Sequence, residues 1–181
     1  CDVAAVTNMH GLFEEALAFN QDVGQWDVSA VTDMSSVFAE AVAFNRDIGN
    51  WDVSAVKDMK NMFRDARAFN QDVGDWDVGA VTDMKRLFYG TIFNQDVGDW
   101  DVSAVTDMSQ MFEYAGFDQD IGQWNTERVR DMSSMFGAES VSIFNQDLGD
   151  WDVSAVTDMR SMFYYAEAFN QDLGDWDVSA V

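Results

Sequence analysis

Apolar and polar positions along the chain recur with a period of about 25 residues. Tryptophan is the clearest marker, with spacings of 24 to 27 residues, and a phenylalanine stands seven residues before every tryptophan. The first six tryptophans are also followed, eight residues later, by a methionine. A fixed period of this size is typical of repeat proteins, in which each unit buries its apolar face against its neighbours. The tryptophans are Trp26, Trp51, Trp76, Trp100, Trp124, Trp151 and Trp176.

The repeat divides the chain into one array of seven units and a short eighth stretch. The units are 1–25, 26–50, 51–75, 76–99, 100–123, 124–150 and 151–175, with 176–181 as a partial unit. Cys1 stands where the first unit would have its tryptophan. All length variation falls between the methionine and the next phenylalanine, so we predict a surface connection there and a fixed register elsewhere. Because the chain begins and ends within a repeat, we expect it to be a segment of a longer protein.

One unit shows the elements that the pattern predicts. Trp26, Asp27 and Val28 alternate apolar, polar and apolar, which indicates a short strand with Trp26 and Val28 turned inward. The next apolar residues are spaced by 3, 4 and 3, as on one face of a helix, and Asp33 is a favoured residue for a helix start. These apolar residues are Val31, Met34, Phe38 and Ala41.

The predicted fold class is therefore α/β, a right-handed solenoid with one short strand and one short helix in each coil of about 25 residues. Helices need more lateral room than strands, so we expect the stack to curve with its strands inside. A glycine stands two residues before every tryptophan, which indicates either a positive φ or a close backbone contact.

The stretch Phe69-Asn-Gln-Asp-Val-Gly-Asp-Trp-Asp-Val78, continued by Val81, Thr82 and Met84, resembles the bacterial surface protein repeat of BspA-like proteins. This resemblance covers the whole chain. The family is a domain of unknown function, distantly similar to leucine-rich repeats, and is found on mollicute and other bacterial surfaces and in marine algae and protists. The resemblance implies a leucine-rich-repeat-like solenoid in an extracellular or cell-surface protein of adhesive or structural kind. It implies no enzyme and supplies no catalytic residues.

The composition of the chain excludes several classes of binding partner. The net charge of −23 argues against nucleic acid, because phosphate contacts require clustered Lys and Arg, and it disfavours anionic lipid. The longest apolar runs are too short to span a membrane, so no membrane insertion is expected.

A single cysteine and a single histidine, His10, provide neither a disulfide framework nor a catalytic triad. Chemically alike carboxylates, repeated in columns, do not suit an acid–base pair. We expect no enzymatic activity.

The aspartates fall in columns, one residue per unit. The columns pass through Asp22, Asp27 and Asp33, and stacked carboxylates repel one another. One reading is that each carboxylate caps backbone N–H groups of a turn or helix start. The alternative is calcium, whose ligands are oxygen atoms. The candidate calcium residues form four clusters: Asp72, Asp75 and Asp77; Asp96, Asp99 and Asp101; Asp147, Asp150 and Asp152; Asp172, Asp175 and Asp177.

The basic residues are concentrated in or next to the predicted helices, which leaves the strand side acidic. An acidic face favours a basic protein partner or divalent cations. The candidate partner-binding residues are Asp27, Asp52, Asp77, Asp101 and Asp152. We therefore expect a non-catalytic surface or structural module that mediates protein–protein contact or adhesion, needing no cofactor. The alternatives are a calcium-dependent module and a spacer or component of a larger assembly.

Both ends of the array expose unfinished apolar surface, so we expect end-to-end association or further repeats. At one end the exposed residues are Val3 and Val6; at the other they are Trp176, Val178 and Val181.

Overall fold

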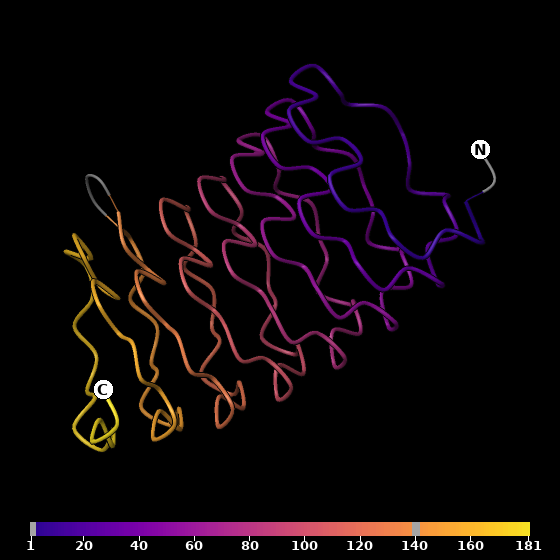
Figure 1. Ribbon diagram of the computed structural model, residues 1–181. Coiled ribbons are helices and arrows are strands. Elements are labelled where there is room, and N and C mark those ends of the chain that lie inside the picture. Colours follow the sequence, from indigo (N-terminus) through magenta and orange to yellow (C-terminus); the bar gives the residue numbers. More distant parts are fainter. Residues whose placement is uncertain (1–2, 139–141) are drawn as a thin grey trace.

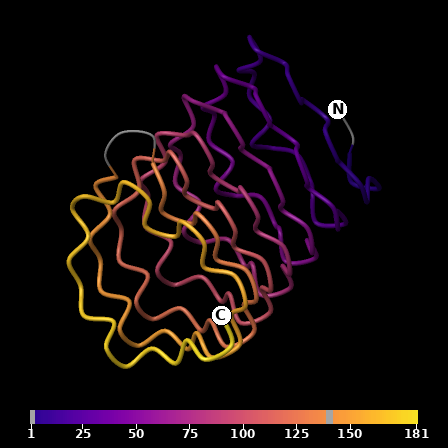
Figure 2. The ribbon, with the colours of Figure 1, turned by 60° about the vertical axis from the view of Figure 1, so that its left-hand side comes forward.

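Each repeat forms one coil of the chain, and the coils lie on one another from the N-terminal to the C-terminal end (Figure 1). The computed structural model describes residues 3–138 and 142–181. Cys1, in the tryptophan column, and part of the insertion between Met132 and Phe144 lie outside these residues. Turned by 60°, the coils appear as a series of similar, slightly displaced rings (Figure 2). Equivalent residues of adjacent coils are joined by single parallel bridges through Asn8, Asp33, Asp58, Asp83, Asp107, Asp131 and Asp158.

The predicted right-handed α/β solenoid, with a helix and a strand in each coil, is wrong. Residues 3–138 and 142–181 contain no helix, and their only β-structure is these single-residue bridges. The rest of each coil is made of turns and irregular backbone. Consequently, the described residues contain no helix long and apolar enough to cross a membrane.

The segment predicted as a helix is instead a run of turns that bonds to the next coil. In the second coil, the N–H groups of Met34, Ser36 and Phe38 donate to carbonyl groups 24 residues further on, at 3.0, 2.9 and 2.9 Å. The intervening amides of Val37 and Ala39 donate three residues back, at 3.3 and 3.1 Å. Alternate amides therefore point out of the coil, whereas in an α-helix every amide bonds within its own segment.

This alternation depends on residues with positive φ. Ser36 and Glu40 have φ values of 57° and 58°, each at the third position of a turn, where a type II turn requires a positive φ. The first such column reads Gly11, Ser36, Asn61, Arg86, Gln110, Ser134 and Ser161. The second includes Glu15, Glu40, Asp65, Gly90, Tyr114 and Tyr165.

The predicted strand at the tryptophan is also wrong as an element, but its side-chain directions are confirmed. Trp51 and Val53 are buried while Asp52 between them is exposed. The indole N–H of Trp51 donates to the carbonyl oxygen of Val23, which lies just before the preceding tryptophan, Trp26, at 3.1 Å. Each later tryptophan makes the equivalent bond, so the indoles tie adjacent coils together.

Two ladders of phenylalanine form the centre of the core. Within the third coil, Phe63 and Phe69 stack with their ring centroids 3.9 Å apart. Between coils, Phe63 stacks on Phe88 at 5.6 Å and Phe69 on Phe93 at 6.1 Å. The coils therefore share a continuous apolar stripe, as expected when each repeat buries its apolar surface on its neighbours.

A close contact explains the glycine that stands two residues before the tryptophan in the first five of its seven occurrences. At Gly74, an added Cβ would lie 2.7 Å from the backbone oxygen of Asp96 in the next coil, and φ at Gly74 is not positive. Side chains other than hydrogen would separate the two coils at this point. Of the two explanations expected from the sequence, close backbone contact is the correct one.

A polar ladder runs beside the phenylalanines. The Asn45 side-chain oxygen accepts the backbone N–H of Asn70 at 3.0 Å and the side-chain N–H of Gln71 at 2.9 Å. The same arrangement recurs along the stack, with Asp118 in the asparagine position of the fifth coil. The asparagine of the repeat therefore joins coils, rather than forming only a local turn.

Candidate functional site

The first aspartate column caps the glycine turn. In each coil one carboxylate oxygen accepts the N–H of the glycine two residues later, at 2.9 to 3.0 Å. This geometry fixes the carboxylate beside the backbone and satisfies an amide that has no partner in regular structure. The members are Asp22, Asp47, Asp72, Asp96, Asp120, Asp147 and Asp172.

The second column caps the turn that follows the tryptophan. Asp27 accepts both the hydroxyl and the N–H of Ser29, at 2.6 and 3.2 Å, and these two bonds, the hydroxyl first, lower the pKa of Asp27. The pKa is lowered in the same way, by a serine two residues on, at Asp52, Asp101, Asp152 and Asp177. Asp77 caps the N–H of Gly79 at 3.1 Å. All five candidate partner-binding residues are exposed members of this column.

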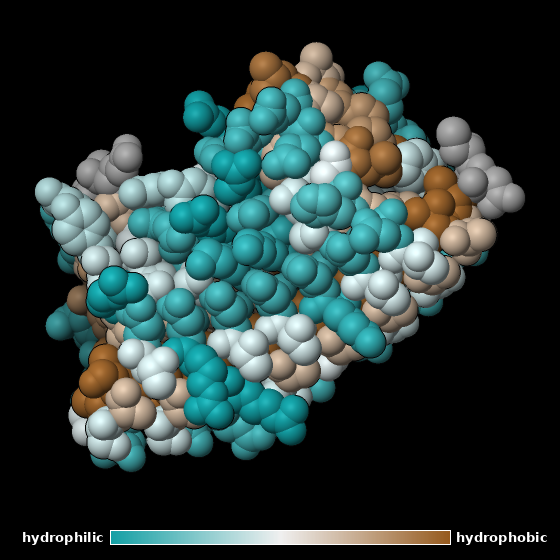
Figure 3. Space-filling model, in the orientation of Figure 1, coloured by the Kyte–Doolittle hydropathy of each residue, from teal (hydrophilic) through white to brown (hydrophobic). Residues whose placement is uncertain are grey.

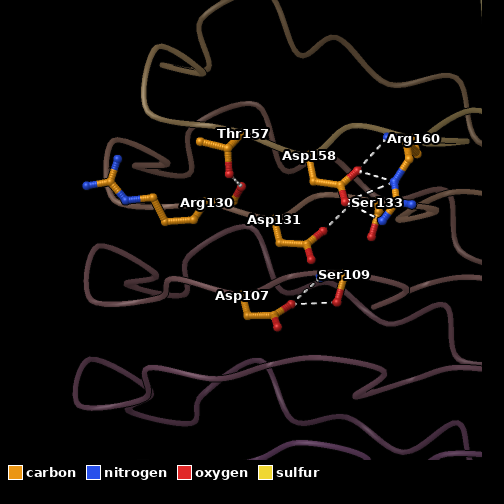
Figure 4. Close-up of polar contacts among 8 residues, drawn as sticks. All are labelled: Asp107, Ser109, Arg130, Asp131, Ser133, Thr157, Asp158 and Arg160. Carbon is orange, nitrogen blue, oxygen red and sulfur yellow. Dashed lines mark hydrogen bonds and ion pairs between the residues drawn. The ribbon is translucent and has the colours of Figure 1, made fainter. Parts of the chain in front are cut away.

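The third column starts the run of turns, where a helix start was expected. Figure 4 shows Asp107, Asp131 and Asp158 in successive coils, with Asp107 accepting the Ser109 hydroxyl at 2.6 Å. Arg160 bonds Asp158 through its side chain at 3.0 and 2.6 Å, and this contact is the main cause of the lowered pKa of Asp158.

Asp83, in the middle of this column, differs from the others. Burial raises the pKa of Asp83, and the neighbouring carboxylates of Asp107 and Asp58 raise it further. The hydrogen bond from the Lys85 N–H and the charge of Lys60 lower it, but the net shift is upward. The ionised carboxylate of Asp83 is therefore a destabilising feature of the folded chain at neutral pH.

A fourth, exposed column lies directly before the tryptophans and caps nothing in the described residues. It contains Gln25, Asn50, Asp75, Asp99, Gln123, Asp150 and Asp175. Together with the first column it lines shallow hollows between adjacent coils, with volumes between about 140 and 240 Å³. One hollow is lined by Asp72, Gly74, Asp75, Asp96 and Asp99.

The structure thus brings together part of each predicted calcium cluster. Residues of the first and fourth columns meet across two coils, but none of the five hollows is lined by Asp77, Asp101, Asp152 or Asp177. These four residues bond to their own turns instead. Across 3–138 and 142–181, no group of three or more acidic, histidine or cysteine side chains is arranged to hold a metal ion.

Charge is divided between two parts of each coil. We define the acidic edge as the stretches 22–27, 47–52, 72–77, 96–101, 120–125, 147–152 and 172–177. These stretches hold 17 of the 33 acidic residues and none of the 10 Lys and Arg residues. The basic side chains lie mainly in the run of turns, where Arg64 pairs with Glu40 at 2.7 Å and Arg86 bonds Gln110 at 2.8 Å.

A second feature was not expected from the sequence. Ile92 and Ile143 are 58% and 51% exposed, and they occupy a position that is alanine or glycine in the other coils. Tyr164 and Tyr165 are also exposed in the last coil. In the sequence, the signal for these exposed apolar side chains was the isoleucine that replaces alanine in the variable segment. Most of the face in Figure 3 is hydrophilic, and its larger apolar patches lie near the two ends of the stack.

Comparison with known protein families matches residues 1–95 and residues 87–181 to the family described as Mycoplasma protein of unknown function, DUF285. The two matches overlap slightly and together cover the chain. No curated protein and no solved structure matches it.

Proposed function

Since the chain belongs to this family of unknown function, DUF285, we propose from its geometry that it is a non-catalytic module that binds a basic protein through its acidic edge. The observation that carries the proposal is that the seven stretches of that edge hold 17 carboxylates and no Lys or Arg. Such a surface attracts and orients a cationic partner over distances of several ångströms. The resemblance to BspA-like repeats supports a place on a cell surface and an adhesive or structural role.

The physical support is preorganisation. The carboxylates of Asp72 and Asp77 are already held by the N–H groups of Gly74 and Gly79, at 3.0 and 3.1 Å. Both side chains are exposed, and the second oxygen of each has no hydrogen bond in the described residues. Because folding already orders these side chains, a cationic partner would bind them with a smaller loss of side-chain conformational entropy.

The test is calorimetric titration with a short oligolysine peptide at several salt concentrations. The variant D75N/D99N/D150N removes three edge charges at positions where Asn50 shows that asparagine is compatible with the repeat. We expect about tenfold weaker binding, at a few tenths to one kcal/mol for each exposed charge, and a smaller salt dependence.

The matched control is E15Q/E127Q/E167Q, which removes three exposed carboxylates outside the acidic edge and has the same net charge. We expect this variant to bind oligolysine almost as well as the parent chain. If both variants weaken binding equally, the peptide is responding to net charge alone, and the acidic edge is not a binding surface.

Calcium is the second candidate, favoured by the hollow that Asp72, Asp75, Asp96 and Asp99 line from two coils. Ions in such hollows would stabilise the folded chain by mass action. Thermal melts of the parent chain and of D75N/D99N/D150N test this candidate. A rise in melting temperature with calcium would replace the first proposal if sodium chloride at equal ionic strength fails to reproduce it and D75N/D99N/D150N removes it. If calcium causes no such rise and both variants weaken oligolysine binding equally, a spacer or a component of a larger assembly is the remaining alternative.

A further inference from the structure

Six of the ten Lys and Arg residues stand in the run of turns of two adjacent coils. These two stretches, 57–67 and 82–92, hold six basic and three acidic residues, whereas acidic residues outnumber basic ones in the corresponding stretches of the other coils. Because the chain as a whole has a net charge of −23, this local excess of positive charge sets the third and fourth coils apart. The six residues are Lys57, Lys60, Arg64, Arg67, Lys85 and Arg86.

Four of these side chains form a surface that we call the basic patch. Lys60 and Lys85 occupy equivalent positions in adjacent coils, and side chains at this position come close together, since the His10 ring nitrogen and the Ser35 hydroxyl lie 2.7 Å apart. None of the four patch side chains forms an ion pair within the described residues. Like charges held side by side repel one another, so the patch favours an anionic partner. Its members are Lys57, Lys60, Lys85 and Arg86.

Arg86 is held in place within the basic patch. Its φ is 54°, a conformation that is costly for a long side chain and that the first coil adopts with Gly11. The Nε–H of Arg86 donates to the side-chain oxygen of Gln110 at 2.8 Å, and the guanidinium carbon lies 5.7 Å from the centre of the Tyr89 ring. The two terminal nitrogens of Arg86 have no hydrogen bond or ion pair to a described residue. They form an ordered fork that matches the geometry of a carboxylate.

Aromatic and aliphatic side chains lie beside this fork. Tyr89 and Tyr114 meet edge to face, with their ring centroids 5.1 Å apart. Tyr114 is 36% exposed, although its φ of 59° makes it a costly residue at this position. The Gly90 N–H donates to the Glu113 carbonyl oxygen at 2.9 Å, which places the 58% exposed Ile92 two residues from this contact between the coils. Arginine and tyrosine are the residues that contribute most often to the energetic centre of protein interfaces.

We propose that the basic patch and these neighbours bind an acidic segment of a partner protein. Carboxylates of the segment lie against the patch, and an apolar side chain lies against Tyr114 and Ile92. The arrangement fits single-stranded nucleic acid less well, because successive bases need a series of aromatic platforms, whereas Tyr89 and Tyr114 pack against each other edge to face. The basic patch lies outside the acidic edge, so the chain presents two surfaces of opposite charge to two different partners.

The experiment is an NMR titration of the isotope-labelled chain with a glutamate-rich peptide that has a pair of leucines at its centre. About ten extended residues are long enough to cover both coils. A chain of net charge −23 repels this peptide overall, so binding reports the local patch and is independent of the oligolysine titration. We expect amide shifts to change in 57–67, 82–92 and 110–114. Unchanged shifts, or changes confined to other parts of the chain, would overturn the proposal.

Two matched variants replace basic residues by those that a neighbouring coil has at the same positions. K57T/K60S/K85S/R86Q removes the basic patch, and R46Q/R128A/R130T/R160S removes the same number of positive charges elsewhere. We expect the patch variant to bind the peptide about tenfold less tightly, and the control variant to bind it as the parent chain does. Equal weakening in the two variants would show a response to net charge alone and would overturn the proposal.

The aromatic contribution is tested separately. Y114G introduces the residue that the preceding coil has at this position, Gly90, which also has a positive φ. We expect Y114G to bind the peptide several-fold less tightly, and a peptide with serines in place of the leucines to bind the parent chain equally weakly. Undiminished binding in both cases would overturn the proposal, since any polyanion would then suffice. The same amide shifts on concentrating the chain without peptide would identify a second copy as the occupant and would overturn it as well.

Discussion

At the scale of single residues, the aspartates of the first three columns act through one local contact. Asp22, Asp27 and Asp33 each accept the N–H of the residue two positions later, and their columns repeat this bond. The capping role was predictable, because a short carboxylate that recurs before a small residue is typical of such turns. The element that the third column begins was not predictable in the same way, since Asp33 is as suitable for a turn as for a helix start.

Asp83 provides a prediction with a defined pH dependence. Because burial and the carboxylates of Asp107 and Asp58 raise the pKa of Asp83, its ionised form opposes folding. D83N keeps an acceptor for the Lys85 N–H, as Asn8 does for His10 at 2.8 Å, and removes that charge. A group whose pKa is higher in the folded than in the unfolded chain favours folding below the unfolded pKa, where it is protonated. This contribution is lost as the pH rises through the folded pKa, so at pH 7 the ionised group only opposes folding. We therefore expect D83N to raise the melting temperature at pH 7.

The pH profile and a matched control test this prediction. The gain from D83N should shrink as pH falls and disappear below the ordinary aspartate pKa of about 4. D52N should have the opposite sign and lower the melting temperature at pH 7. The Ser54 hydroxyl lowers the pKa of Asp52, so the ionised Asp52 stabilises the folded chain above the ordinary aspartate pKa. Thermal melts of both variants from acid to neutral pH measure the two signs. A loss of stability in D83N at pH 7 would contradict the interpretation.

At the scale of the element, the spacing of the apolar residues predicted correctly which side chains are buried, but it predicted the wrong backbone conformation. Val31, Met34, Phe38 and Ala41 are all fully buried, as an apolar helix face requires. Turns with a left-handed third residue produce the same spacing of three and four, because each turn returns the chain to the same side. The sequence signal that separates the two was weak: only Gly11 and Gly90 mark the left-handed columns with glycine.

Ser134 tests whether the positive-φ residues hold strain. Its φ is 54°, which costs a non-glycine residue about 1–2 kcal/mol, and no side-chain hydrogen bond of Ser134 is found in the described residues. Glycine relieves that strain but loses more backbone entropy on folding, so we expect S134G to stabilise the chain by a few tenths to about 1 kcal/mol. Denaturant unfolding measures the change.

The neighbouring serine is the control. Ser133 has no positive φ, so S133G incurs the entropy cost without relief of strain and should lower stability by about 0.5–1 kcal/mol. Equal destabilisation by S134G and S133G would mean that the turn carries no strain at position 134.

At the scale of the whole molecule, the periodic register was the part that the sequence predicted best. Tryptophan burial is confirmed in the interior, where Trp51 and Trp76 are 4% and 3% exposed. The parallel bridges at Asp33 and Asp58 also join residues of equivalent repeat position. What joins the coils was missed, because bonds such as Asn45 to Asn70 connect residues 25 positions apart and leave no local pattern. For the same reason, the hollows between coils were predictable only in part.

A stack in which each coil contacts only its neighbours should lose stability locally. W76A removes a buried indole that stacks on Phe63, with ring centroids 6.4 Å apart, and donates to the carbonyl oxygen of Ile48 at 3.2 Å. That oxygen keeps its bond from the Trp51 N–H at 3.0 Å, so the main cost is the cavity, about 3–5 kcal/mol. We expect hydrogen exchange to accelerate most in 51–99 and least in the first and last coils. The exposed control Y164A should leave exchange in 51–99 unchanged. Uniform acceleration along the whole chain would instead show that the coils unfold as one cooperative unit.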